Sequence, residues 1–244
     1  MVSVLIVAAG RGTRMARHSA SAVSDKLFLP LGDRPVLAHC LTLAQQCAEV
    51  GEIIVVTRAE TIPAIRALAE KFRVARLAQI VEGGAERQDS VWNGLQALHA
   101  HADIVAVHDG ARPFFPVALM PQLIAVARQY GSAVVCTKIT DTIKEIAPDS
   151  SIAHSPIPPF PDSLTVVKTV DRAKLRAVQT PQVFQVPLLQ RAYARVRDKK
   201  LQVTDEAAAA ELLGEKIQLV ENPAPNPKIT TPLDLCFAEM LLKV

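Results

Sequence analysis

The first residues with the character of a chemical site follow the apolar run at the start of the chain. Ala8 and Ala9 lead into Gly10-Arg11-Gly12-Thr13-Arg14, so small residues and two arginines come directly after a predicted strand. Glycines let a ligand approach the backbone closely, and exposed amides beside cationic side chains favour phosphate. The segment lacks the third glycine of the dinucleotide fingerprint, and the chain has no Gly-Lys pair of a P-loop. It therefore predicts another kind of phosphate-binding loop, in preference to a plain turn.

A second glycine-rich turn, Gly83-Gly84, precedes Ser90 at the start of a predicted helix. The glycine pair suits close approach by a ligand, but an ordinary capped turn between a strand and a helix explains the segment equally well. The role of Lys26 is equally undecided, because a lone lysine usually lies on the solvated surface.

The segment His108-Asp109-Gly110-Ala111-Arg112 follows another predicted strand. Ligands of open parallel sheets bind outside the carboxyl ends of the strands, and a carboxylate there can hold a divalent cation near phosphates. An Asp109–Arg112 pair that closes the turn is the alternative, and the basic glycine-rich loop opposite favours the metal. A lone histidine at a strand end, such as His108, is more often a hydrogen-bonded core residue.

Several later segments combine threonines with charged residues, and each alone is typical of a turn or a helix cap. Threonines and basic groups together can hold a hydroxylated phosphate. These segments are Asp141-Thr142, Thr169–Arg172, Thr180-Pro181-Gln182, Thr204–Glu206 and Asn226–Lys228.

Short β-branched runs alternate with longer amphipathic stretches, which predicts a mostly parallel sheet covered on both faces, within one domain over residues 1–244. The predicted strands are Val2–Ala8, Glu52–Thr57, Val74–Val81, Asp103–His108 and Ala133–Lys138. The predicted helices are Pro35–Cys47, Ile62–Phe72, Arg87–Ala100 and Pro116–Tyr130, with further helix starts capped by Thr204 and by Thr231 before Pro232.

The alternation breaks in a segment at about 141–172, which carries five prolines between Pro148 and Pro161. Prolines at this density deny the backbone its ladder donors, so the segment is not core sheet. A surface loop and a projecting arm that contacts a second subunit explain it equally well.

Composition narrows the class of protein. The chain has 244 residues, is 50% hydrophobic and carries a net charge of +3, so it can bury a core and its charge alone does not favour nucleic acid. No apolar run approaches the roughly 18–20 residues that span a bilayer. The first cation, Arg11, follows the N-terminal apolar run, an order that is wrong for a secretory signal. Four scattered cysteines argue against zinc and disulfides, and we expect a soluble, cytoplasmic protein.

Taken together, these motifs occur in the order of a known family along nearly the whole chain. The chain resembles the 2-C-methyl-D-erythritol 4-phosphate cytidylyltransferases of the non-mevalonate isoprenoid route. The motifs that carry the resemblance are Ala8–Met15, Lys26, Gly83-Gly84, Ser90, His108–Pro113, Thr169–Arg172, Thr180–Gln182, Thr204–Glu206 and Lys228. The resemblance implies an α/β, Rossmann-like fold with a projecting dimerisation arm. It also implies that CTP and methylerythritol phosphate give CDP-methylerythritol and pyrophosphate, with Mg²⁺ or another divalent cation.

The resemblance also assigns roles by position. Arg14 and Lys26 would stabilise the transition state, Arg172 and Lys228 would orient the attacking phosphate, and Asp109 would bind the metal. The residues that would surround the nucleotide are Ala8, Ala9, Gly10, Arg11, Gly12, Gly83, Gly84, Ser90, Asp109 and Ala111. The residues that would hold methylerythritol phosphate are Arg112, Thr142, Arg172, Thr180, Thr204 and Lys228.

In this family the arm reaches into the partner subunit, so Thr142 and Arg172 would serve the neighbouring active site of a homodimer. The chain departs from the family in two places. The stretch from Arg14 to Lys26 is long, with Asp25 where the family usually has proline, and the arm carries an insertion at Ser155–Pro161.

Two other functions compete with this interpretation. A pentitol-phosphate cytidylyltransferase, such as the ribitol 5-phosphate enzyme, shares the fold and a very similar His-Asp-Gly motif. A non-catalytic nucleotide-binding module is the second, and the joint presence of Arg14, Lys26, Asp109 and Lys228 argues against it, because binding alone does not require all four.

Overall fold

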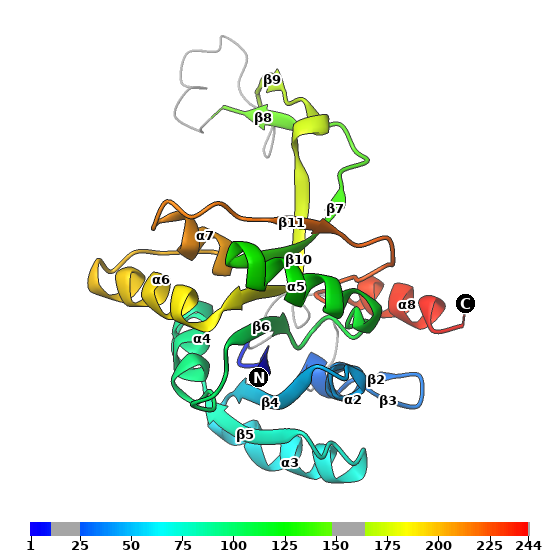
Figure 1. Ribbon diagram of the computed structural model, residues 1–244. Coiled ribbons are helices and arrows are strands. Elements are labelled where there is room, and N and C mark those ends of the chain that lie inside the picture. Colours follow the sequence, from blue (N-terminus) through cyan, green and yellow to red (C-terminus); the bar gives the residue numbers. More distant parts are fainter. Residues whose placement is uncertain (11–24, 148–163, 244) are drawn as a thin grey trace.

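A seven-stranded sheet forms the centre of the molecule (Figure 1). The computed structural model describes residues 1–10, 25–147 and 164–243. In spatial order the sheet consists of β11 (Leu219–Glu221), β7 (Ser132–Lys138), β10 (Arg176–Gln185), β6 (Ile104–Asp109), β1 (Val2–Val7), β4 (Val50–Thr57) and β5 (Leu77–Glu82). Within this sheet β10 runs antiparallel to β6 and β7, and the other neighbouring strands pair in parallel. The predicted mostly parallel sheet is confirmed.

Helices cover both faces of the sheet, as predicted, because the strands are apolar on both sides (Figure 1). In β1, Val4 and Ile6 belong to one core cluster and Leu5 to the other, since successive side chains of a strand point to opposite faces. The first cluster contains residues of α2 (Val36–Gln46), α3 (Ile62–Lys71) and α5 (Met120–Tyr130). The second contains residues of α4 (Arg87–Gln96), α6 (Val186–Asp198) and α7 (Glu206–Glu211).

The C-terminal helix α8 (Pro232–Leu241) packs on a small hairpin of β2 (Pro30–Leu31) and β3 (Arg34–Pro35) through a third apolar cluster that includes Leu31 and Ile229. Thr231 caps this helix as predicted: its hydroxyl accepts from the Asp234 amide, and the Asp234 carboxylate accepts in return from the Thr231 amide. Short 3₁₀ turns precede or join several elements: η1 (Lys26–Phe28), η2 (Ala59–Thr61), η3 (Val117–Leu119) and η5 (Arg172–Lys174).

Two local predictions were wrong. Thr180-Pro181-Gln182 is part of β10 and not a turn; the pairing register of β10 shifts between Val178 and Gln182, where Pro181 has no amide to donate. The N-cap of α7 is Asp205 and not Thr204, because the Asp205 carboxylate accepts from the Ala208 amide at 2.9 Å. Helix α6 and strand β11 were not predicted from the sequence.

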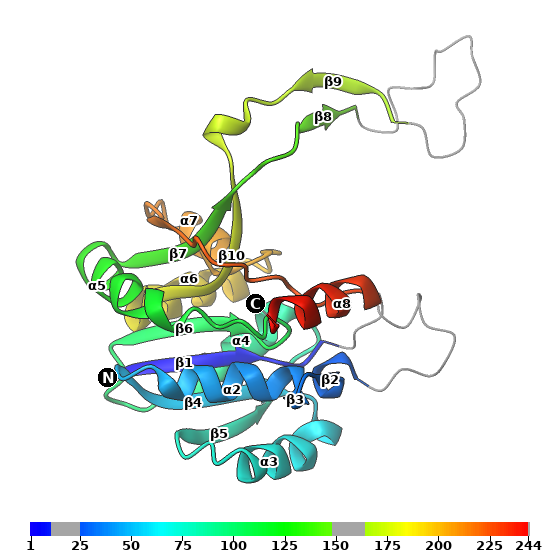
Figure 2. The ribbon, with the colours of Figure 1, turned by 90° about the vertical axis from the view of Figure 1, so that its right-hand side faces the viewer.

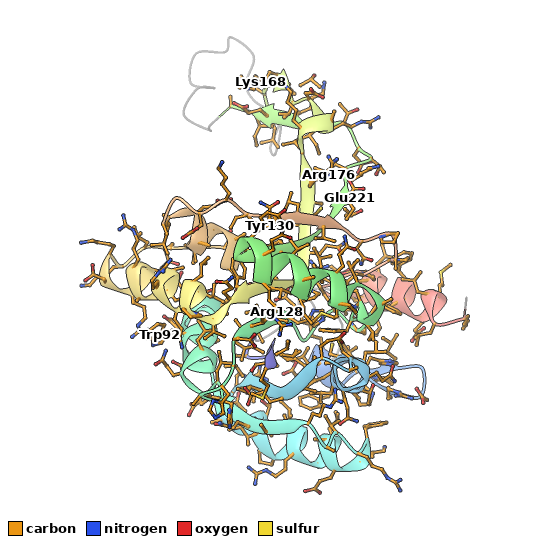
Figure 3. All side chains as sticks on the ribbon, viewed as in Figure 1. Trp92, Arg128, Tyr130, Lys168, Arg176 and Glu221 are labelled. Carbon is orange, nitrogen blue, oxygen red and sulfur yellow. The ribbon has the colours of Figure 1, made fainter. Side chains whose placement is uncertain are left out.

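The segment after β7 leaves the central sheet. Strands β8 (Lys144–Ile146) and β9 (Val166–Thr169) pair antiparallel in a separate two-stranded sheet, which Figure 2 shows projecting away from the body. At the base of this ribbon, Arg176 of β10 and Glu221 of β11 lie side by side in Figure 3, with Nε 2.9 Å from the carboxylate. The segment is therefore a projecting arm. Its insertion at Ser155–Pro161 lies outside the described residues, and its role in a dimer stays a prediction. Among the described helices, none has the length and apolar character needed to cross a bilayer.

Candidate active site

The carboxyl ends of β1, β5 and β6 open into one cleft of about 540 Å³. Ten of the residues singled out from the sequence line it: Ala8, Ala9, Gly10, Lys26, Gly83, Gly84, Ser90, Asp109, Ala111 and Lys228. They come from segments far apart in the chain, and the parallel sheet brings them together at one edge.

The remaining predicted residues lie elsewhere. Arg112 and Thr180 are next to Asp109 but do not line the cleft. Thr204 is exposed in the loop before α7. Thr142 and Arg172 belong to the arm, where Arg172 Nη1 donates to the Thr140 carbonyl. Arg11, Gly12 and Arg14 lie outside the described residues.

The carboxylate of Asp109 is the electrostatic centre of the cleft. Lys228 Nζ lies 2.7 Å from Oδ2, Arg87 Nη2 3.3 Å from Oδ1, and Arg112 Nε 3.8 Å from Oδ2. Burial alone would raise the pKa of Asp109, but Arg87, Lys228 and Arg112 outweigh it and hold that pKa well below its usual range. The predicted Asp109–Arg112 contact exists, but it is the longest of the three.

Arg87, which the sequence analysis did not select, joins Asp109 to a buried acid. Its guanidinium lies 2.7 and 3.2 Å from the two oxygens of Glu206, whose side chain is fully buried and also accepts from the Tyr193 hydroxyl at 3.1 Å. Burial opposes the charged form, but Glu206 and Asp109 hold the pKa of Arg87 above its ordinary value. The only sequence signal was a basic residue after the Gly83-Gly84 turn, and its partner lies 119 positions away.

The backbone of Asp109 is held by Thr180 and His108. The Asp109 amide donates to Thr180 Oγ1 at 3.1 Å, and that hydroxyl lies 3.2 Å from His108 Nδ1. His108 Nε2 lies 2.9 Å from the Arg112 carbonyl, which can only accept, so Nδ1 is the unprotonated nitrogen. Burial lowers the pKa of His108 to about 4. His108 is thus the hydrogen-bonded core residue that the sequence favoured.

Two lysines reach the cleft from different segments. Lys26 Nζ donates to the Ile229 carbonyl at 2.8 Å, and the Ile229 amide donates to the Ala111 carbonyl at 2.8 Å. Because Ile229 is buried and adjacent to Lys228, these contacts place Lys26 and Lys228 near the end of β6.

Close packing explains one glycine of the second turn. A Cβ on Gly83 would lie 2.7 Å from both Ala9 Cβ and Ser90 Oγ, closer than such atoms approach. The Ser90 hydroxyl also accepts from the Gly84 amide at 3.2 Å, and Glu86 caps α4. The segment is therefore a capped turn that also lines the cleft, and its contact with a ligand stays a prediction.

The cleft also holds Arg58 and Glu60, which the sequence analysis missed. Among the described lining residues, four cations face four acids: Lys26, Arg58, Arg87, Lys228 and Glu60, Glu82, Glu86, Asp109. Two of these acids have partners in their own segments, since Glu60 pairs with Arg58 and Glu86 caps α4. Arginine and lysine donors around a glycine-lined cleft suit a phosphorylated ligand.

A divalent cation fits this site only if the bound phosphorylated substrate supplies most of the oxygens that coordinate it. Among the described residues, no group of three or more His, Cys, Asp or Glu side chains could hold a metal ion. Magnesium is commonly bound by one or two carboxylates together with substrate phosphates, so the single carboxylate of Asp109 is compatible with it.

Comparison with known proteins identifies the family. The family model for 2-C-methyl-D-erythritol 4-phosphate cytidylyltransferase matches residues 2–244. Proteins of that name from Bacillus mycoides and Syntrophotalea carbinolica are 37% and 40% identical, over 100% and 99% of this chain and 99% and 96% of theirs.

Solved structures agree. A 4-diphosphocytidyl-2C-methyl-D-erythritol synthase from Anaerococcus prevotii is similar with a TM-score of 0.80 and 29% identity, covering 100% of this chain and 99% of that one. The 2-C-methyl-D-erythritol 4-phosphate cytidylyltransferase from Thermus thermophilus has a TM-score of 0.73 and 32% identity, covering 99% and 98%. With ten of its motif residues on one cleft and matches from end to end, this chain belongs to the 2-C-methyl-D-erythritol 4-phosphate cytidylyltransferase family.

Proposed function

We propose that the protein transfers the cytidylyl group of CTP to 2-C-methyl-D-erythritol 4-phosphate, giving CDP-methylerythritol and pyrophosphate for isoprenoid biosynthesis. The observation that carries this proposal is the convergence of Lys26, Asp109 and Lys228 on one cleft in a chain that matches the family over its full length. A module that only binds nucleotide would not need this arrangement of charges.

The chemistry needs positioning and positive charge more than a base. A phosphate oxygen of the polyol phosphate attacks the α-phosphorus of CTP, a new P–O bond forms, and the bond to the pyrophosphate oxygen breaks. The attacking oxygen is already anionic, so no proton has to be removed. Lys26 would stabilise the negative charge that develops on the α-phosphate, and Lys228 would orient the incoming phosphate. His108 is buried behind this surface and takes no part as a base.

A bound Mg²⁺ would neutralise charge on the triphosphate and help pyrophosphate to leave. Asp109 would hold it, because its carboxylate stays ionised and faces the cleft.

We also propose that the arm makes a homodimer and delivers Thr142 and Arg172 to the neighbouring cleft. Apolar side chains on the arm support this, since Ile146, Leu164, Val166 and Val167 are 48%, 60%, 51% and 58% exposed in the single chain. Exposed apolar patches of this kind mark contact surfaces.

A cytoplasmic location belongs to the same proposal. CTP and the polyol phosphate are charged metabolites of the cell interior, and all four cysteines carry free thiols.

The direct test measures pyrophosphate release from CTP and Mg²⁺ with methylerythritol phosphate, and in parallel with ribitol 5-phosphate, with the product identified by mass spectrometry. We expect CDP-methylerythritol and faster turnover of methylerythritol phosphate. Faster turnover of ribitol 5-phosphate would reject methylerythritol phosphate as the substrate. If the protein binds CTP but releases no pyrophosphate with either polyol phosphate, the proposed enzymatic activity is wrong.

A further inference from the structure

The guanidinium of Arg58 joins three parts of the chain beside the cleft. Nη2 lies 2.5 Å from Asp25 Oδ2, Nη1 donates to the Gly10 carbonyl at 3.0 Å, and Nε donates to Glu60 Oε1 at 2.8 Å. Arg58 directly follows β4. A single side chain therefore connects the end of β4 to Gly10 and Asp25, the residues that flank positions 11–24.

The backbone of Arg58 is itself fixed to the sheet. The Arg58 carbonyl accepts from the Thr61 amide at 3.0 Å and from the Thr61 hydroxyl at 2.9 Å. That hydroxyl lies 2.6 Å from the hydroxyl of Thr57, the last residue of β4, and both threonines are buried. Arg58 is thus held by the core, and the position of its guanidinium follows from the position of β4.

Asp25 transmits this position to Lys26. Its Oδ1 accepts from the Leu27 amide at 3.1 Å and caps the turn η1, whose first residue is Lys26, while Oδ2 pairs with Arg58. Both carboxylate oxygens are therefore engaged, one by the turn and one by the core. On the other side, the Lys26 ammonium donates to Ile229.

The burial of this pair distinguishes it from a surface ion pair. The side chains of Arg58 and Asp25 are 17% and 12% exposed, whereas those of the pair Arg34–Asp33 are 30% and 70% exposed. Ion pairs on the surface contribute little, but neutralising Asp25 removes the buried partner of Arg58, leaves it paired with the exposed Glu60, and lets its surroundings rearrange.

We propose that the Asp25–Arg58 pair is a positioning device for Lys26, fixing the backbone of that lysine to the end of β4 so that its ammonium meets the α-phosphate. This inference rests on the proposed function, which gives Lys26 its role. Asp25 and Arg58 act through Lys26, and so they should influence turnover more than CTP binding.

The test compares Asp25→Asn with Asp33→Asn. Asparagine keeps the side-chain oxygen that caps η1 but removes the charge that pairs with Arg58. We expect Asp25→Asn to lower kcat by about 10- to 100-fold with KM for CTP changed less than about threefold, because small misplacements of a reacting group cost this much. Asp33→Asn also removes an Asp–Arg pair, but away from the cleft, and should leave kcat unchanged.

A double-mutant cycle and lysine labelling separate positioning from a general loss of structure. In the Asp25→Asn/Arg58→Gln double variant, kcat should be no lower than in the worse single variant, since both changes break the same contact. The rate at which acetic anhydride modifies Lys26, read by peptide mass spectrometry, should change several-fold in Asp25→Asn and not in Asp33→Asn. This labelling does not depend on turnover, so it tests the positioning of Lys26 even if the proposed function fails.

Three results would overturn the proposal: a kcat of Asp25→Asn within twofold of wild type, multiplicative losses in the double variant, or unchanged labelling of Lys26. An inactive wild-type enzyme would instead overturn the proposed function.

Discussion

At the scale of single residues, the cleft depends on one carboxylate that stays charged although it is almost buried. The side chain of Asp109 is 10% exposed, and the cations of Lys228, Arg87 and Arg112 around it compensate the cost of burial. Glu206 in turn compensates Arg87. The charges form a chain from the core to the cleft, so replacing one member changes the electrostatics of the next.

Lys26 is the residue for which the mechanism makes the sharpest prediction. Lys26→Ala should lower kcat by on the order of 10²-fold or more, because it removes a charge that acts mainly on the transition state. The affinity for CTP should fall much less. Steady-state pyrophosphate release and calorimetric titration with CTP measure the two effects. Lys199→Ala, on an exposed lysine, is the control. Nearly normal turnover in Lys26→Ala would remove this lysine from the mechanism.

His108 should make stability depend on pH. Its folded pKa of about 4 lies below the ordinary 6.5, so between these values the unfolded chain binds more protons than the folded one. Stability is therefore complete above pH 6.5 and declines as the pH falls, by roughly 3 kcal/mol once the pH is below 4. The pKa of Asp109 is also lowered, so its contribution is lost in the same direction, but only as the pH falls below the ordinary value of 3.8.

Urea unfolding in EDTA at several pH values between 4.5 and 6.5 measures this slope. His108→Gln should flatten it, and a change at the exposed His101 serves as the control. An equal slope in wild type and His108→Gln would contradict the assignment of a neutral, buried imidazole.

How far the site could be predicted depends on the kind of signal each residue carries. Lys26, Asp109 and Lys228 stand in motifs that place them on the cleft. Arg58 follows β4 and Arg87 begins α4 without a distinctive motif, and their partners Asp25 and Glu206 lie 33 and 119 positions away. No local sequence pattern encodes such pairs, because only the packing of the sheet brings the two side chains of each pair together.

At the scale of elements, the strands with continuous apolar character were predictable, and β10 was not. Its N-terminal part is exposed or half-buried, and Pro181 interrupts a run that also contains polar residues. Tertiary context overrides these local signals, because the strand is inserted between β6 and β7. From the sequence, the arm could be recognised only as a segment where the regular alternation of strands and helices stops.

The corrected cap of α7 gives a prediction with a matched control. Asp205→Ala should destabilise the fold by about 1–2 kcal/mol, since it removes the bond to the Ala208 amide. It also removes the acceptor of the Gln182 side chain. Thr204→Ala, on the exposed neighbour, should change stability by less than about 0.5 kcal/mol. Urea unfolding of both variants measures the difference. Equal losses would restore Thr204 as the cap.

At the scale of the whole molecule, the described lining of the cleft does not include every residue that the family resemblance assigns to the site. Lys26 and Lys228 line the cleft, whereas Arg172 belongs to η5, between β9 and β10 in the arm that projects from the body (Figure 2). If the substrate phosphate needs both Lys228 and Arg172, the second must come from a partner. Dimerisation would then be a condition of catalysis and not only of stability.

Mixed dimers test whether the site is shared. The number of intact sites in them depends on whether Arg172 acts in the cleft of its own chain or in that of its partner. When Arg172→Ala and Lys26→Ala subunits pair, an Arg172 acting in trans leaves one cleft with both groups intact and the other with neither. Random mixing of equal amounts should then restore about a quarter of the wild-type activity, since about half of the dimers are mixed. Each variant alone should stay nearly inactive, and size-exclusion chromatography should confirm that dimers form. If Arg172 acted within its own chain, every cleft would carry one lesion, and confirmed mixed dimers without recovered activity would contradict the shared site.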